Sequence, residues 1–291
     1  MGASRRGGAG LAYVAPALLF VATFVLYPLG RLVWLSLTNT SLLGGSGFVG
    51  LRNYVRAFND PAVWHALWFT VEYTLAITPI LMGLGLLLAL LTAEQSRLAK
   101  LTRAVVFLPV VIGLGSSSLL WYWLFDQQVG LFNRLLQDLH IIAHPIVWFA
   151  DADLAFWAVI LSVVWKVVGF GMILLLAAIQ AIGAEVEEAA RIDGAGYWQR
   201  ARLITLPLVA RTLLLTTLVS AIGSMLAFDP FYIMTAGGPQ GATFTSVYWI
   251  YQNSFIYFKQ GYGATLSLLT MVIILAMAVL HNVAARRWAS E

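Results

Sequence analysis

Residues 185–207 have the sequence EVEEAARIDGAGYWQRARLITLP and lie between two long apolar segments. Acidic residues stand at the start of the stretch, where a helix N-terminus favours negative charge. Gly194 can supply a positive φ or a close backbone approach near the middle. Pro207 is tolerated in the first turn of a following helix. The stretch therefore predicts a short helix, a turn and a second helix that leads into the next apolar segment.

The rest of the chain has the composition of a membrane protein. Hydrophobic residues make up 60% of the 291 positions and charged residues only 10%. A bilayer core of roughly 30 Å needs about 20 apolar helical residues. Six segments meet this requirement: about 11–37, 67–93, 104–125, 154–181, 204–228 and 262–285. With no internal repeat and no linker, we expect an all-α membrane protein with six transmembrane helices, forming one domain over residues 1–291.

The positive residues in the connections indicate the orientation, because Lys and Arg are retained on the cytoplasmic side. The N-terminus, the 94–103 turn, the 182–203 loop and the C-terminus together hold ten Lys and Arg residues, whereas the opposite side holds five. Both termini and the 182–203 loop are therefore predicted to be cytoplasmic. The pI near 9.4 is explained by topology, so nucleic-acid binding is not needed to account for it.

The 182–203 loop and the residues after it resemble the "EAA" loop of permease subunits in binding-protein-dependent ABC importers. The matching positions are Glu188, Ala189, Ala190, Asp193, Gly194, Ile204, Leu206 and Pro207. In that family the loop docks on the ATPase. The resemblance implies that the first short helix is a coupling helix and that Glu188 meets a basic residue of the ATPase.

The same resemblance implies a set of partners. These are a second, homologous permease chain, two ATPase subunits and an external solute-binding protein, with the whole complex in a bacterial or archaeal inner membrane. The chain contains no G-x-x-x-x-G-K-[ST] motif. We therefore expect no enzymatic activity, cofactor or metal on this chain, and ATP and magnesium on the partner ATPase.

Two further stretches favour the carbohydrate-uptake subfamily. Residues 48–54, FVGLRNY, resemble a segment after the first span of such permeases, and residues 226–263, which contain MTAGGP and GYG, resemble their outer loop. The expected solute is a sugar or sugar-like molecule. A glycerol-phosphate diester or a polyol is the alternative, because importers of those solutes share these motifs.

Polar residues inside the spans are candidates for the solute pathway, because charges at membrane depth are costly and are commonly functional. Lys166 lies roughly 18 Å from the outer end of the fourth span at 1.5 Å per residue, close to the bilayer middle. Glu72 in the second span is its possible partner, and Gln180 continues one polar face of the fourth span. A structural ion pair and a pathway-lining role both remain open for Lys166.

The fifth span carries a stripe of small and weakly polar residues that includes Thr216, Ser220 and Ser224. Such stripes let helices pack closely, and their hydroxyl groups would also suit a polyhydroxylated solute. The competing class of protein is an ion-driven secondary transporter. That class typically shows repeats, broken helices and intramembrane carboxylates.

Overall fold

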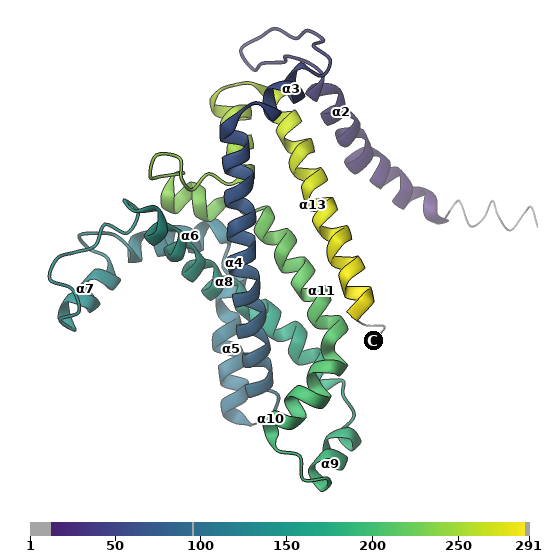
Figure 1. Ribbon diagram of the computed structural model, residues 1–291, viewed down its shortest axis with the longest axis vertical. Coiled ribbons are helices and arrows are strands. Elements are labelled where there is room, and N and C mark those ends of the chain that lie inside the picture. The colour runs from purple at the N-terminus through teal and green to yellow at the C-terminus, as the bar shows by residue number, and fades with distance from the viewer. Residues whose placement is uncertain (1–12, 95, 289–291) are drawn as a thin grey trace, which may run out of the picture. The chain divides into compact units, whose positions relative to one another are not determined.

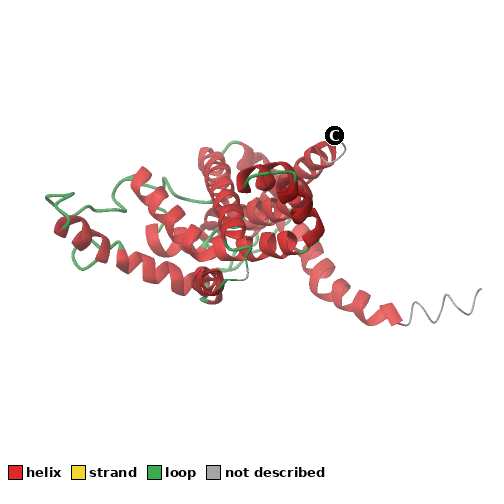
Figure 2. Cartoon of the chain, turned by 90° about the horizontal axis from the view of Figure 1, so that it is seen from below, coloured by secondary structure: helices red, strands yellow, loops and turns green. Residues whose placement is uncertain are grey.

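The computed structural model describes residues 13–94 and 96–288. The described residues form helices and loops and contain no β-strand, with one isolated bridge between Thr38 and Phe48 (Figure 2). The all-α prediction is confirmed. Arg5 and Arg6, which contributed to the predicted orientation, lie outside the described residues.

Within the described residues, five helices are long and apolar enough to cross a membrane: Tyr13–Ser36, Pro61–Leu91, Ala152–Gln180, Tyr197–Met225 and Gln260–Ala285. The labelled elements up to the end of the third span are η1 (Ala22–Leu26), α2 (Tyr27–Ser36), α3 (Arg52–Phe58), α4 (Pro61–Leu91), α5 (Arg97–Val111) and α6 (Leu114–Leu124) (Figure 1). The later elements are α7 (Leu131–Asp138), α8 (Ala152–Gln180), α9 (Ala184–Ile192), α10 (Tyr197–Arg200), η2 (Ala201–Thr205), α11 (Leu206–Met225), η3 (Phe231–Thr235), α12 (Ser246–Tyr251), η4 (Gln252–Ile256) and α13 (Gln260–Trp288).

The third predicted span, 104–125, is not one straight helix. Helices α5 and α6 meet at an angle of 101°, with the break at Ile112 and Gly113. Both break residues have extended backbone conformations, and Pro109 lies in the last turn of α5. The structure therefore has six spans if the bent pair counts as one span, which agrees with the predicted number.

The chain divides into two compact units. The first comprises Met1–Trp64 and Trp249–Val272, and the second comprises His65–Tyr248 and Ile273–Glu291. Helices α4 and α13 each begin in the first unit and end in the second. The expectation of one membrane domain over the whole chain remains a prediction.

In the first unit, the two stretches that indicated the carbohydrate subfamily pack together. Asn53 of the FVGLRNY stretch donates through Nδ2 to the carbonyls of Ser36 and Thr38, at 2.9 and 2.8 Å. These carbonyls lie at the end of α2, where backbone oxygens lack helical partners. Gly261 of the GYG stretch approaches the Thr38 carbonyl so closely that a Cβ atom has no room. The FVGLRNY and GYG residues thus close the end of the first span.

In the second unit, α8 is the central helix. Its residues Met172, Leu175 and Ile179 form a buried apolar cluster with Ala89 of α4 and Val209 of α11. Glycines bring the backbones close together, because an added Cβ on Gly169 would meet the Val106 carbonyl of α5 and lie 3.0 Å from Phe107 Cα. Small residues commonly permit this close approach between membrane helices. The core of this unit is therefore built around α8.

Candidate coupling site

The loop between the fourth and fifth spans folds as predicted, with α9, a turn and α10. Helix α9 ends in a Schellman motif, in which the Ala195 N–H donates to the Ala190 carbonyl at 3.0 Å and the Gly194 N–H donates to the Arg191 carbonyl at 3.1 Å. Gly194 has a φ of +80°, a conformation that favours glycine. The structure confirms the positive φ expected at this position.

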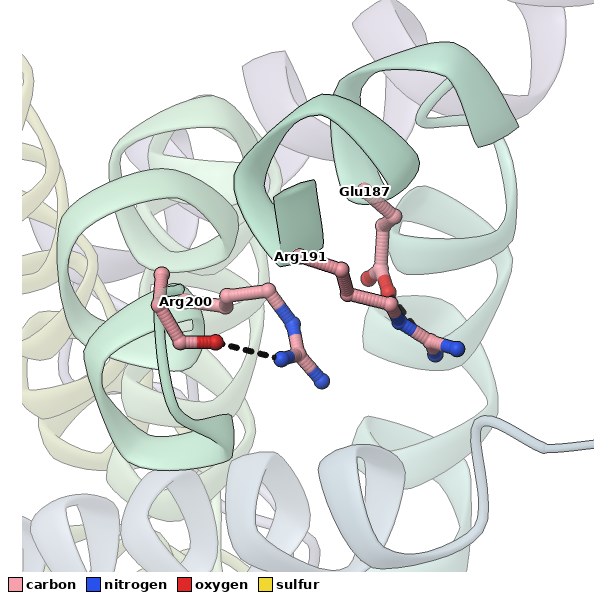
Figure 3. A network of polar contacts seen from close by, with 4 residues as sticks. Glu187, Arg191 and Arg200 are labelled. Atoms are coloured by element: carbon pink, nitrogen blue, oxygen red, sulfur yellow. Dashed lines mark hydrogen bonds and ion pairs between the residues drawn. The ribbon is translucent and has the colours of Figure 1, made fainter. Parts of the chain in front are cut away.

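The second half of the loop is held by two side chains. The Gln199 Oε1 atom accepts a hydrogen bond from the Gly196 N–H at 2.8 Å, which is half of a capping box at the start of α10. Arg200 Nη1 donates to the Ala195 carbonyl at 2.7 Å (Figure 3). Helix α10 then continues through the π-helical turn η2 into α11, with Pro207 in its first turn. The turn is therefore fixed to the end of the fifth span.

The residues of the predicted coupling motif divide into exposed and buried positions. Glu188 and Ala189 are exposed, whereas Ala190 is buried. Glu187, which precedes them, forms an ion pair with Arg191 at 3.8 Å, one helical turn further on (Figure 3). Ala190 therefore anchors α9, and Glu188 is free to meet another molecule.

A cavity of about 340 Å³ lies between α9 and neighbouring residues of α4, α8 and α10. Its lining combines acidic, basic and apolar side chains from α4, α8, α9 and α10. The polar members are Glu94, Gln180, Glu187, Glu188, Arg191, Tyr197, Arg200 and Thr205. Gln180, which the sequence suggested as a pathway residue, thus lies at the C-terminal end of α8, beside the predicted coupling motif.

The coupling loop also exposes large apolar side chains. Ile192 at the end of α9 is 86% exposed, and Trp198 and Leu203 are exposed as well. Trp198 and Leu203 belong to the helix Tyr197–Met225, which is apolar enough to cross a membrane, so the large exposed apolar side chains of α9 itself are Val186 and Ile192. The loop therefore combines a rigid backbone with an uncovered apolar and acidic surface.

Lys166 and Glu72 form no ion pair in the described part of the chain. Lys166 is buried and donates through Nζ to the Val110 carbonyl of α5 at 2.9 Å. Glu72 is exposed on α4. Arg211, in the first half of α11, is also exposed on a span, although the sequence argument did not include it.

Two hydroxyl groups of the α11 stripe, those of Thr216 and Ser224, bond to their own helix. Thr216 Oγ1 donates to the Thr212 carbonyl and Ser224 Oγ donates to the Ser220 carbonyl, both at 2.8 Å. Such bonds satisfy the hydroxyl proton locally and leave the oxygen available as an acceptor. Thr216 and Ser224 are buried and Ser220 is half-buried. The described residues contain no group of three or more His, Asp or Glu side chains arranged to hold a metal ion.

Comparisons with known proteins identify the family. Residues 12–290 match the family described as the binding-protein-dependent transport system inner membrane component. The lactose transport system permease protein LacF of Rhizobium radiobacter is 36% identical over 95% of this chain and 94% of that protein. The trehalose/maltose transport system permease protein MalF of Thermococcus litoralis is 32% identical over 95% and 93%. The chain belongs to this family of multi-pass inner-membrane transport permeases.

Solved structures confirm the fold. One is a chain of the bacterial alginate ABC transporter, crystallised in complex with an alginate pentasaccharide-bound periplasmic protein. It superposes on this chain with a TM-score of 0.86 at 20% sequence identity. The match covers 98% of this chain and 96% of that chain. A chain of an amino acid ABC transporter covers 80% of this chain and 97% of its own, with a TM-score of 0.53. The fold is that of an ABC-importer permease.

Proposed function

We propose that this chain is one of the membrane-spanning subunits of an ATP-driven importer for sugars or sugar-like solutes. The observation that carries the proposal is the coupling loop, in which a Schellman turn presents exposed Glu188 and Ile192 on a rigid helix. The names of the relatives, lactose and trehalose/maltose permeases, support a sugar as the solute.

We infer that the energy source lies on another chain. The sequence lacks a phosphate-binding loop, so ATP and magnesium would bind two ATPase subunits that dock on the coupling loops. Closure of the ATPases would draw the loops together and turn the permease from inward-facing to outward-facing. Such a change needs two packings of similar free energy that nucleotide binding can bias.

The exposed surface of the fifth span supports a second, homologous permease subunit. Only 17% of the apolar window in Tyr197–Met225 is buried within the chain, although this helix carries Arg211 and several hydroxyl residues. An ionisable side chain on a span normally faces protein or a water-filled cavity. We infer that the second permease chain and the solute pathway cover this face.

The solute class has one supported alternative within the same machinery. A relative named the sulfoquinovosyl glycerol transport system permease protein SmoG, from Agrobacterium fabrum, is 32% identical over 92% of this chain and 87% of that protein. The alternative to a plain sugar is a glycerol-phosphate diester or a polyol, and the glycerol in that relative's name is what supports it. An external binding protein would deliver either solute, and its ligand would identify the solute.

Charge reversal tests the coupling role of Glu188. In membranes that contain the whole complex, Glu188→Lys should remove ATPase co-purification or solute-stimulated ATP hydrolysis, while the permease itself still inserts. Asp138→Lys makes the same charge change on an exposed residue of α7 and should leave both properties intact. Normal coupling in Glu188→Lys would refute the proposed role of the loop.

The proposed orientation, with both termini in the cytoplasm, has its own test. The chain contains no cysteine, so each introduced cysteine is unique. Gly196→Cys should react with membrane-impermeant thiol reagents only from the cytoplasmic face, and Gln240→Cys only from outside. Labelling in the opposite sense would overturn the orientation without affecting the assignment to the family.

A further inference from the structure

The break in the third span leaves the Val110 carbonyl, near the C-terminal end of α5, without its helical partner, whereas the Pro109 carbonyl accepts from the Ile112 N–H at 3.2 Å. The Val110 carbonyl would normally accept a hydrogen bond from the residue four positions later, but that residue, Leu114, begins the separate helix α6. The last carbonyls of a helix also carry the negative end of its dipole. An uncovered helix end within a membrane is costly because no water is present to bond it.

Lys166 covers this end. Its Nζ donates to the Val110 carbonyl at 2.9 Å. Its helix, α8, lies close to α5 because Gly169 has no side chain to keep the two backbones apart. Gly169 lies against Val106, one turn before Val110 on α5, and Lys166 lies three residues before Gly169 on α8. The ammonium is therefore aimed at the helix end by a close contact between the two backbones.

The other side of the break carries the opposite charge. Gly115 lies in the first turn of α6, and a Cβ atom built on it would lie 4.0 Å from Asp229 Oδ1 and 3.7 Å from Ile233 Cδ1. A carboxylate stabilises the N-terminal end of a helix, where the dipole is positive. Asp229 comes from the segment between α11 and η3, more than a hundred positions away along the chain.

We propose that Lys166 and Asp229 are positioning residues that hold the third span broken, each matching the dipole of one half-helix.

A distance measurement tests the positioning role without reference to any solute. Spin labels at Leu101 of α5 and Leu119 of α6, both exposed, report the bend when the assembled complex is placed in lipid nanodiscs. A straight helix would separate the labelled Cα atoms by about 27 Å. We expect a shorter, narrow distribution in the native protein, because the half-helices meet at 101°.

Charge removal should populate a straighter or more variable third span. In Lys166→Met and in Asp229→Asn, we expect the ratio of bent to extended conformers to fall by about tenfold, within the range for a partly buried charge at a helix end. Lys166→Arg should restore the native distribution. Asp153→Asn, an exposed carboxylate change on the same helix as Lys166, is the matched control.

Native distance distributions in both Lys166→Met and Asp229→Asn would overturn the positioning role.

Discussion

The fourth and fifth spans show how differently two helices of the same unit are used. In Ala152–Gln180, 67% of the apolar window is buried within the chain, whereas in Tyr197–Met225 the value is 17%. The fourth span makes its close contacts inside the chain, through Gly169 and Lys166. The fifth span continues directly from the coupling loop and leaves most of its surface uncovered.

The difference indicates a division of roles. A bilayer gives apolar helices little hydrophobic reason to associate, so packing and polar contacts decide which faces meet. The fourth span has both kinds of contact and acts as the framework of its unit. The fifth span has an accessible face and a mechanical link to α9, which suits a helix that transmits movement to a partner chain.

The largest expected effect comes from removing the core of the fourth span. Leu175 is fully buried in the apolar cluster, so Leu175→Ala should cost about 2 kcal/mol or more through the cavity that it leaves. Leu215→Ala removes the same atoms from a residue of α11 that is 62% exposed and should leave the isolated chain intact. Thermal unfolding of the two purified variants measures this difference in stability. Equal losses of stability in Leu175→Ala and Leu215→Ala would contradict the prediction.

A pair of glycines gives the next largest contrast. Gly169→Ala would place a methyl group against the Val106 carbonyl of α5 and should destabilise the chain by about 1–3 kcal/mol. Gly223→Ala on α11 has nothing within 4 Å of the new Cβ and should be neutral or stabilising, because Ala is the better helix former. The yield of folded protein in detergent compares the two glycine variants. A stable Gly169→Ala variant would show that α5 and α8 can separate without cost.

Substitutions at Gly194, in the turn between α9 and α10, should act only through the backbone conformation that they allow. Gly194 has open space around its Cβ position, so only the φ of +80° restricts it. Gly194→Val should cost about 1–3 kcal/mol of local strain and uncouple ATP hydrolysis from uptake, while the spans stay folded. Gly194→Asn should retain more activity, because Asn tolerates left-handed conformations. Equal activity in both variants would show that the backbone conformation at Gly194 does not affect coupling.

The smallest expected effect concerns the ion pair on α9. Glu187 and Arg191 are four residues apart and solvent-accessible, so Glu187→Ala should change stability by only about 0.3–0.5 kcal/mol. ATPase stimulation should remain near the native value, in contrast to Glu188→Lys. A large loss in Glu187→Ala would indicate that this pair, too, is part of the docking surface.

Local signals predicted the fold of the 182–203 loop well. The acidic start, Gly194 and Pro207 each have a direct physical meaning within a few residues, and the helix, turn and helix follow from them. The break in the third span was not predicted, because residues 104–125 read as a continuous apolar run. Pro109, Gly113 and Gly115 were the available signals, and the break follows their positions.

The polar contacts inside the membrane depended on that break. Lys166 could not be matched to the Val110 carbonyl from sequence, because that carbonyl is unpaired only once α5 ends nearby. An opposite charge at a similar depth, Glu72, was the natural partner to consider. Long-range partners of this kind follow from backbone geometry that a hydropathy pattern does not contain.

Cross-linking from α9 tests the central claim most directly. In the cysteine-free chain, Ile192→Cys places one thiol on the exposed end of α9, and Ile141→Cys places a matched thiol on an exposed loop residue after α7. With a bifunctional thiol–amine reagent on native membranes, the account predicts a covalent adduct with the ATPase subunit from position 192, altered by ATP, and none from position 141. An ATPase adduct from position 141, or none from position 192, would contradict it.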